Sequence, residues 1–335
     1  MKKLKIIIAL LIISMLCVFV FCGCKKTASN PVNKYGKLSV SGTNIVDENG
    51  TSFQLKGFST LGLTWFSDII NEASFKSLRD DLGANCIRAS MYIDENGDKS
   101  CYLENKSRNK ELMINTVDYC IDLGMYVIVD WHILNPGDPS AYTDEAVAFF
   151  KEMSEKYKDV PNVIYEICNE PNGSKVKWDT VIKPYCETVI SAIRENSKDS
   201  LIICGTGSWC QDIDAVIGSK IEDENVVYSV HYYASTHKQW LRDRVKDCYD
   251  AGIPMLISEF GVCAASGDGK LDLDEAQKWF DFLDELKIGY VNWSISDKKE
   301  AASVFKKGTD LTKGNWTDED LTESGLFVKN HYLSK

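Results

Sequence analysis

The chain has 335 residues, of which 44% are apolar and 11% aromatic, and its formal net charge at pH 7 is −11. This length supports one large hydrophobic core and is too short for two barrels. Because the chain is acidic and has no run of lysine and arginine, its composition argues against nucleic acid as a partner.

The first 23 residues predict a secretory signal peptide. Three lysines precede an uncharged apolar run over residues 6–21, a pattern typical of a leader and not of a core helix or a permanent membrane span. Gly23-Cys24 resembles the cleavage site of bacterial lipoproteins, in which the new N-terminal cysteine is lipidated, and plain secretion is the alternative. We therefore expect an extracellular protein, either secreted or held at the cell surface through a lipid on Cys24.

Nine of the twelve cysteines follow Cys24, and their pattern does not indicate a disulfide framework. Cys86, Cys168 and Cys204 lie inside apolar, strand-like runs, and no C-x-x-C spacing of a zinc site occurs. We expect small buried thiols, with one disulfide bond as the alternative.

Residues 24–36 are polar and unpatterned and predict a linker, so the folded catalytic domain is expected to span residues 37–335. Residues 38–54 predict a short N-terminal β-hairpin with Asn49-Gly50 as its turn. Such a hairpin could plug the bottom of a barrel.

Strand-like and helix-like segments then alternate to the end of the chain. The predicted strands cover residues 53–58, 85–90, 126–131, 163–168, 201–205, 226–230, 255–258 and 290–293. The predicted helices cover about 72–83, 109–123, 143–157, 176–197, 211–217, 238–251, 273–286 and 320–332, and two of them end at Gly124 and Gly252. Eight strands that are each followed by a helix predict an α/β fold of the (β/α)₈ TIM-barrel type. A doubly wound sheet would need G-x-G-x-x-G after its first strand, which G-F-S-T-L-G does not match.

Two carboxylic acids stand at the ends of predicted strands. The stretch V-I-Y-E-I-C-N-E-P ends in Asn169, Glu170 and Pro171, and a proline ends a strand because it cannot donate to the ladder. The stretch P-M-L-I-S-E-F-G places Glu259 at the end of another strand. Barrel enzymes carry their catalytic groups at these strand ends, so we expect Glu170 and Glu259 to face each other.

Further polar and aromatic residues fall at the same rim: Arg88, His132, His231, Tyr233 and Trp293. Each alone could be structural, but the whole set favours a functional site. Two carboxyl groups beside aromatic rings fit glycoside hydrolysis, because the rings hold sugar faces and the carboxylates stabilise an oxocarbenium-like transition state. Arg88 would keep one carboxylate ionised, while burial and a neighbouring negative charge would raise the pKa of the other. Metal-dependent hydrolysis would need converging ligands such as H-E-x-x-H; none appears, so we expect no metal and no cofactor.

Eight motifs then occur in a recognisable order: L-K-G-F-S-T-L-G-L-T-W-F, I-R-A-S-M-Y, D-W-H-I-L-N-P-G-D-P, V-I-Y-E-I-C-N-E-P-N-G, G-T-G-S-W-C-Q-D, V-H-Y-Y-A-S-T-H, I-S-E-F-G and V-N-W-S-I-S-D-K-K-E. With these motifs, nearly the whole chain from Gly36 onward resembles the bacterial endo-1,4-β-glucanases of glycoside hydrolase family 5, formerly cellulase family A. The resemblance implies a retaining enzyme that hydrolyses internal bonds of β-1,4-glucan or cello-oligosaccharides by double displacement, with Glu170 as acid/base and Glu259 as nucleophile.

The resemblance also implies roles for the surrounding residues. Asn169 would hydrogen-bond the sugar 2-hydroxyl, Arg88 and Tyr233 would position Glu259, and His132 and His231 would line the same subsite. Trp293 would form its floor. Trp65 and Trp209 would be sugar platforms, and the residues in contact with sugars on the non-reducing side would be Tyr92, Lys298 and Glu300.

The chain departs from the family at three positions. Leu61 stands where a histidine is common, which predicts the loss of one polar sugar contact; Phe260 and Ser294 replace a usual Trp and Asn. Ser294 follows Trp293 where the family tends to have a non-proline cis peptide. We expect a monomer. The alternatives are a mannanase, xyloglucanase or lichenase on the same barrel, or a non-catalytic glucan-binding lipoprotein.

Overall fold

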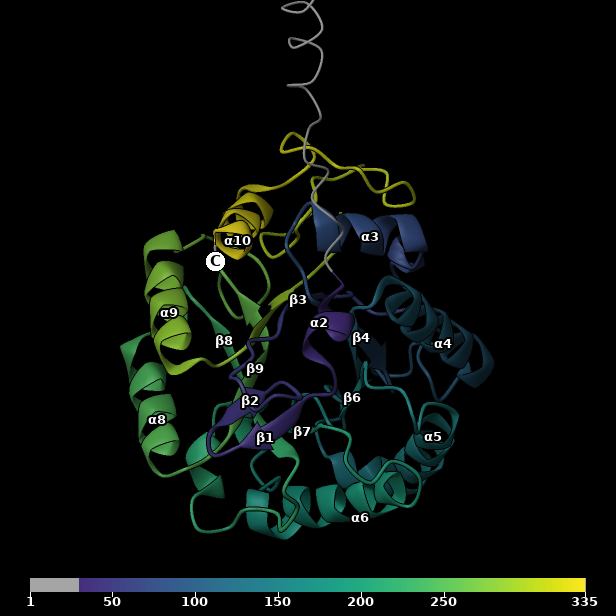
Figure 1. The fold of residues 1–335 in the computed structure, drawn as a ribbon, viewed down its shortest axis with the longest axis vertical. Helices are drawn as coiled ribbons and strands as arrows, with labels where there is room; N and C mark the ends of the chain where they lie inside the picture. The colour runs from purple at the N-terminus through teal and green to yellow at the C-terminus, as the bar shows by residue number, and fades with distance from the viewer. Residues whose placement is uncertain (1–29, 335) are drawn as a thin grey trace, which may run out of the picture.

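Eight parallel strands form a closed barrel, as predicted (Figure 1). The computed structural model describes residues 30–334, so the predicted signal peptide and the lipid site at Cys24 lie outside the described residues. The strands succeed one another around the barrel in chain order, and β10 closes it by pairing with both β9 and β3. Their bounds are β3 Lys56–Ser59, β4 Cys86–Tyr92, β5 Tyr126–His132, β6 Val163–Glu166, β7 Ile202–Cys204, β8 Val226–Tyr233, β9 Met255–Gly261 and β10 Tyr290–Trp293.

The helices surround this barrel, as Figure 1 shows. They are α3 Glu72–Asp80, α4 Lys106–Leu123, α5 Thr143–Lys156, α6 Lys183–Arg194, α8 Gln239–Asp250, α9 Leu273–Leu286 and α10 Glu323–Leu333, with a π-helical turn, η3 Trp178–Ile182, before α6 and 3₁₀ turns η1 Ser67–Ile69 and η2 Pro139–Tyr142. Gly124 ends α4 in the left-handed conformation that the prediction requires, with φ of 64°. The backbone N–H of Gly124 thereby reaches the last carbonyls of the helix.

Side chains alternate along each strand between the barrel interior and the helices. On β5, Val127, Val129 and Trp131 pack in the core between barrel and helices, whereas Tyr126 and Ile128 belong to a second apolar cluster inside the barrel. The period of two continues to Asp130 and His132, which therefore point inward. The upper barrel interior is thus polar, and the lower interior is apolar.

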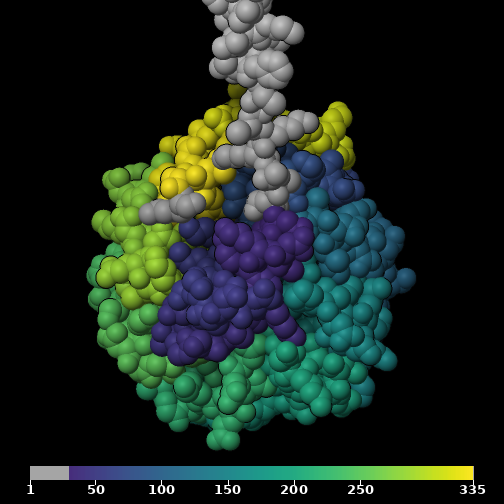
Figure 2. Space-filling model, viewed as in Figure 1, coloured from purple at the N-terminus to yellow at the C-terminus, as the bar shows by residue number. Residues whose placement is uncertain are grey.

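The N-terminal segment closes the lower end of the barrel. It consists of α2 Pro31–Tyr35 and the antiparallel strands β1 Ser39–Ser41 and β2 Asn44–Val46, which lie across the centre of the face seen in Figures 1 and 2. Its buried residues share one cluster with the lower ends of the barrel strands: Val32, Leu38, Ile45, Phe53 and Leu55 pack with Tyr126, Ile164, Ile203, Val227 and Leu256. The expectation that a hairpin plugs the bottom is confirmed.

The hairpin turn itself was predicted at the wrong place. Gly42, with φ of 62°, and Thr43 connect β1 to β2. Asn49-Gly50 makes a second turn, after which only Ser52 pairs back with Val46. Either glycine can adopt the required positive φ, so the turn signal alone did not distinguish them.

The predicted helix 211–217 is replaced by two short turns, α7 Gly207–Cys210 and η4 Ile213–Val216. Within α7, Ser208, Trp209 and Cys210 all have φ between 54° and 60°. Three successive left-handed residues cannot continue a right-handed helix. The sequence G-S-W-C therefore forms a tight turn at the upper rim.

The nine cysteines of the described chain are all buried and none forms a disulfide bond. Eight of the nine lie in the core clusters or within the barrel strands and surrounding helices, as predicted for small apolar side chains. Within residues 30–334, no helix is both long enough and apolar enough to span a bilayer.

Candidate active site

A cleft of about 260 Å³ opens at the carboxyl ends of the barrel strands. Nine of the predicted site residues line it: Tyr92, His132, Glu170, Trp209, Tyr233, Glu259, Trp293, Lys298 and Glu300. Arg88, Asn169 and His231 lie buried directly behind this lining. Trp65 is the exception, because it lines a neighbouring hollow with Phe66 and Asp297.

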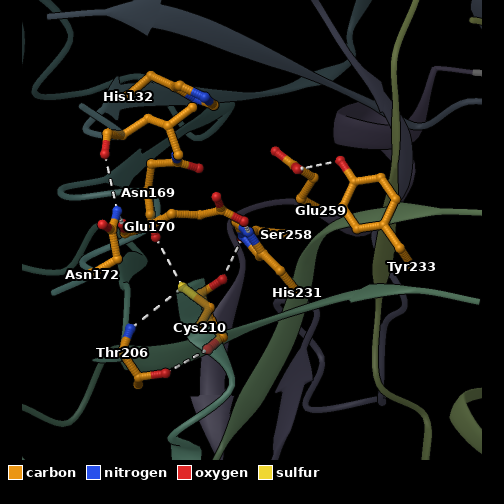
Figure 3. Close-up of polar contacts among 12 residues, drawn as sticks. His132, Asn169, Glu170, Asn172, Thr206, Cys210, His231, Tyr233, Ser258 and Glu259 are labelled. Atoms are coloured by element: carbon orange, nitrogen blue, oxygen red, sulfur yellow. Dashed lines mark hydrogen bonds and ion pairs between the residues drawn. The ribbon is translucent and has the colours of Figure 1, made fainter. Parts of the chain in front are cut away.

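Both carboxylate oxygens of Glu259 are held by hydrogen bonds. Nη1 of Arg88 donates to Oε2 at 2.9 Å. The hydroxyl of Tyr233 donates to Oε1 at 2.7 Å (Figure 3). Burial and the negative charge of Glu259 raise the pKa of Tyr233 well above its usual value, so its hydroxyl keeps the proton it donates. Glu259 is therefore fixed in one orientation by a cation on one oxygen and a hydroxyl group on the other.

Arg88 is the centre of a buried ionic network. Its guanidinium contacts Glu259, Glu166 (2.6 Å) and Asp130 (3.1 Å), and its Nη2 donates to Oδ1 of Asn169 at 2.6 Å. Burial alone would lower the pKa of Arg88, but the three carboxylates outweigh burial and raise it. A planar guanidinium with five donors suits this task better than an ammonium group.

Glu170 is linked to the same network through His231 and Ser258. Nδ1 of His231 lies 2.7 Å from Oε1 of Glu170, and Nε2 lies 3.0 Å from Oγ of Ser258, which donates to Glu166 at 2.5 Å. Burial opposes protonation of His231, yet its contacts with Glu166 and Glu170 and the charge of Glu259 raise its pKa to about 9. At neutral pH His231 is therefore a cation that donates from both ring nitrogens.

The two glutamates face each other across the cleft. One carboxylate oxygen of Glu170, one of Glu259 and one ring nitrogen of His231 lie within 4.8 Å of one another. Among the described residues this is the only group of three or more side chains placed to hold a metal ion. Nδ1 of His231 is already bonded to Glu170 and Nε2 to Ser258, however, so neither ring nitrogen is without a protein partner.

Aromatic rings form one wall of the cleft. Trp293 stacks on His132 at a centroid distance of 5.4 Å, and the ring of Tyr92 packs against the same imidazole at 4.1 Å. Burial and the charge of Arg88 lower the pKa of His132 to about 3, so the imidazole is neutral at pH 7. Nδ1 of His132 shares one hydrogen bond with Oδ2 of Asp130, 2.6 Å away. The peptide bond after Trp293 is cis, as expected from the family.

Two further predicted residues form an ion pair at the rim, where Lys298 and Glu300 lie 2.6 Å apart. Trp209 is 47% exposed and stands over the cleft on the turn α7. Leu61 also lines the cleft. The position at which one polar sugar contact is expected to be lost therefore presents an apolar side chain to the cleft. Trp65 contacts the ring of Tyr92 at 4.3 Å and donates to Ser100, and it is not brought into the cleft itself.

Sequence reasoning did not find Glu166, Ser258 and Cys210. Glu166 and Ser258 lie inside predicted strands, and a polar residue within an apolar strand was the signal that could have identified them. Cys210 was classed with the apolar thiols, although its Sγ contacts the backbone of the active site. Asp130 begins the motif D-W-H-I-L-N-P-G-D-P, but its contact with Arg88 depends on the closed barrel.

Comparisons with known proteins agree with this geometry. A family model described as Cellulase (glycosyl hydrolase family 5) matches residues 46–299. An endoglucanase of Clostridium saccharobutylicum is 46% identical over 294 residues, which are 88% of this chain and 64% of that protein. Endoglucanase A of Evansella cellulosilytica is 46% identical over 84% of this chain and 56% of its own length. The chain thus spans less than two thirds of these relatives.

The catalytic domain of Thermobifida fusca endoglucanase Cel5A is structurally similar, with a TM-score of 0.86 and 36% identity over 91% of this chain and 100% of that domain. A variant of that domain has been solved in complex with cellotetraose, with the same TM-score and coverage.

Proposed function

The chain belongs to glycosyl hydrolase family 5, and on this basis we propose that it is a retaining endo-β-1,4-glucanase. The observation that carries the proposal is the approach of Glu170 and Glu259 to within 4.8 Å between carboxylate oxygens. Retaining glycosidases have their two carboxyl groups about 5–5.5 Å apart, whereas inverting enzymes need about 6.5–9.5 Å to admit a water molecule. The endoglucanase relatives and the cellotetraose complex support a β-1,4-glucan or cello-oligosaccharide as substrate.

In the first step Glu259 attacks the anomeric carbon while Glu170 gives its proton to the glycosidic oxygen. The bond between that carbon and the leaving oxygen breaks, and a glycosyl ester with Glu259 forms. Arg88 and Tyr233 hold both oxygens of Glu259, so the attacking oxygen is already oriented and little reorganisation is needed.

In the second step Glu170, now ionised, removes a proton from water, and the hydroxide attacks the same carbon and releases Glu259. The charged His231 donates to Glu170 at 2.7 Å and thereby stabilises the carboxylate that the first step creates. The two displacements together retain the anomeric configuration.

The other predicted site residues bind the sugar chain in this proposal. Asn169 bonds the 2-hydroxyl at the cleavage point, and His132, His231 and Trp293 enclose the same subsite. Trp209, exposed in the lining of the cleft, serves as a sugar platform. On the non-reducing side the contacts are Tyr92, Lys298 and Glu300, whereas Trp65 would serve as a platform only from the neighbouring hollow that it lines.

We also propose that residues 1–23 are a secretory signal and that Cys24 carries a lipid, which would place the enzyme at the outer cell surface. This proposal rests on the leader sequence alone. Metabolic labelling with a radioactive fatty acid tests it: label in the parent chain and none in C24A is the expected result, and unlabelled, released protein would favour plain secretion.

Glu259→Gln is the direct test of the mechanism. The amide keeps the shape of the side chain but cannot form the glycosyl ester, so hydrolysis of carboxymethyl-cellulose should fall by about 10⁴-fold or more. The melting temperature should change little. Glu285→Gln on the exposed side of α9 is the matched control and should retain full activity. Substantial hydrolysis by E259Q would refute the assignment of the nucleophile.

The preferred polymer follows from rates on carboxymethyl-cellulose, lichenan and glucomannan, with viscosity and reducing ends measured together. A fast fall in viscosity with few new reducing ends on the β-1,4-glucans is expected for internal cleavage. A folded protein that binds cello-oligosaccharides and releases no reducing ends from any of the three would instead be a sugar-binding protein.

A further inference from the structure

The peptide group that joins Asn169 to Glu170 is held at both of its polar atoms. The N–H of Glu170 donates to the carbonyl of Ile133, beyond the end of β5, at 3.2 Å. The carbonyl of Asn169 accepts a hydrogen bond from Sγ of Cys210, on the turn α7, at 2.9 Å (Figure 3). The plane of this peptide sets the direction in which the Glu170 side chain leaves the backbone.

This peptide needs such support because the local backbone is unusual. Asn169 has φ of 37°, a conformation that costs free energy for a residue with a side chain and persists only where the surroundings enforce it. Strand β6 has already ended at Glu166, so no neighbouring strand pairs with the carbonyl of Asn169. A buried carbonyl without a donor would be costly, and Cys210 supplies the donor.

The thiol is well placed to act as that donor. Cys210 is fully buried, and the N–H of Thr206 donates to the same sulfur at 3.4 Å. The sulfur is thus held from one side by a backbone donor and points its own proton to Asn169. Burial, with the nearby charge of Glu170, raises the pKa of the Cys210 thiol, which keeps that proton on the sulfur.

Gly205 confines the same carbonyl from another direction. A Cβ atom built on Gly205 would lie 2.4 Å from the carbonyl oxygen of Asn169 and 2.8 Å from Cδ of Pro171. The carbonyl therefore fits against bare backbone at the end of β7, and any larger residue at 205 would displace it. The hydrogen bond and the steric contact are independent observations that fix one atom.

The turn that carries Cys210 also carries Trp209. The N–H of Trp209 donates to the carbonyl of Pro171 at 3.1 Å, so α7 contacts the segment of Glu170 on both sides of that residue. The three left-handed residues Ser208, Trp209 and Cys210 allow the thiol to point down to Asn169 while the indole stays above in the cleft.

We propose that Cys210 is a positioning residue for the acid/base Glu170, acting through the hydrogen bond from its thiol to the carbonyl of Asn169. The inference rests on the proposed function, because it assigns Glu170 the protonation of the leaving oxygen. Without the thiol, the peptide plane can rotate, and the carboxyl group of Glu170 moves away from that oxygen.

Cys210→Ala tests the proposal with two substrates that differ in their need for acid catalysis. Cleavage of cellopentaose needs a proton on the leaving oxygen, whereas 2,4-dinitrophenyl β-cellobioside has a leaving group that departs without one. Because kcat/KM reports the first irreversible step, C210A should lose about tenfold to a hundredfold in kcat/KM on cellopentaose. On the dinitrophenyl substrate the loss in kcat/KM should stay below about threefold.

Matched variants separate positioning from a general loss of packing. Cys210→Ser keeps a donor and should restore kcat/KM on cellopentaose to within about threefold of the parent. Cys248→Ala removes an equally buried thiol from α8, outside the barrel, and should leave both substrates unaffected. Gly205→Ala displaces the same carbonyl from the other side and should show the selective loss of C210A, so the test survives if C210A does not fold.

Equal losses on both substrates, full activity in C210A and G205A, or a C210S variant as poor as C210A would each overturn the proposal. The parent chain provides the separate check on the proposed function. If the parent cleaves neither substrate, the glucanase assignment fails; if it cleaves both and the variants show no selectivity, only the positioning role fails.

Discussion

At the scale of single residues, the site depends on how a few charges are shared. One buried guanidinium, Arg88, serves three carboxylates, and a charged His231 joins the fourth, Glu170, to the network through Ser258. A buried carboxylate without a partner would take up a proton and lose its nucleophilicity. The network therefore places a cation beside each of the two glutamates, Arg88 beside Glu259 and His231 beside Glu170.

This network predicts a loss of stability at alkaline pH. The pKa of His231 is about 9 in the folded protein and about 6.5 when unfolded, so folding favours the protonated form. The stabilisation is fully present below pH 6.5 and is lost as pH rises to about 9, by up to about 3 kcal/mol. Urea denaturation of the parent chain should show the free energy of unfolding falling over this range.

The same measurement on His231→Gln provides the comparison, since an amide does not titrate. H231Q should be less stable than the parent at pH 6.5 and should lack the slope between pH 6.5 and 9. A parent curve that is flat over this range, or an equal slope in H231Q, would contradict the raised pKa.

The sequence was sufficient to identify the site residues that stand at strand ends. It was insufficient for the buried residues within the strands that bond to them. Glu170 and Glu259 were recognisable because each ends an apolar run. Glu166 reaches Arg88 from a strand on which nothing marks it except its charge. Its place in the site depends on the tilt and closure of the barrel, which bring side chains from β4, β6 and β9 to one point.

At the scale of elements, strands were predicted better than turns. All eight barrel strands overlap their predicted ranges because buried parallel strands are continuous apolar runs. The turn α7 was missed because its three left-handed residues carry ordinary side chains and no glycine signal. Their conformation follows from contacts to Pro171 and Asn169, which are distant from the local sequence pattern.

The hairpin at the lower end of the barrel should contribute to stability and not to catalysis. Leu38 is 2% exposed in the cluster that closes the barrel, whereas Leu333 on α10 is 47% exposed. Leu38→Ala should therefore lower the free energy of unfolding by about 2–5 kcal/mol, and Leu333→Ala should change it by about 0.5 kcal/mol or less. Chemical denaturation measures both.

Both leucine variants should keep the kcat of the parent at a temperature where they are folded, because neither side chain lines the cleft. A Leu38→Ala variant as stable as Leu333→Ala would show that the hairpin does not seal the barrel.

At the scale of the whole molecule, closure of the sheet leaves no free barrel edge among the described strands, which removes a common route to aggregation. The same closure buries nine thiols without joining them. Thiolates are the reactive form, and burial raises the pKa of Cys86, Cys120, Cys186, Cys204 and Cys210 among others.

We therefore expect these nine cysteines to be inert in the folded protein. With 5,5′-dithiobis(2-nitrobenzoate) at pH 8, none should react over the time in which a free thiol is fully labelled, and all nine should react in urea. A thiol that reacts quickly without denaturant would indicate local opening of the element that carries it, and mass spectrometry of the labelled peptide would identify it.

The position of the N-terminal segment also determines which way the cleft faces. Val32 bonds to the carbonyl of Gly124 at the lower end of the barrel, whereas Glu170 and Glu259 open at the upper end. The polypeptide therefore enters the domain on the side opposite to the substrate entrance. If the chain before Asn30 attaches the protein to a surface, the cleft faces away from that surface. A long polysaccharide could then bind across the cleft without contacting the surface.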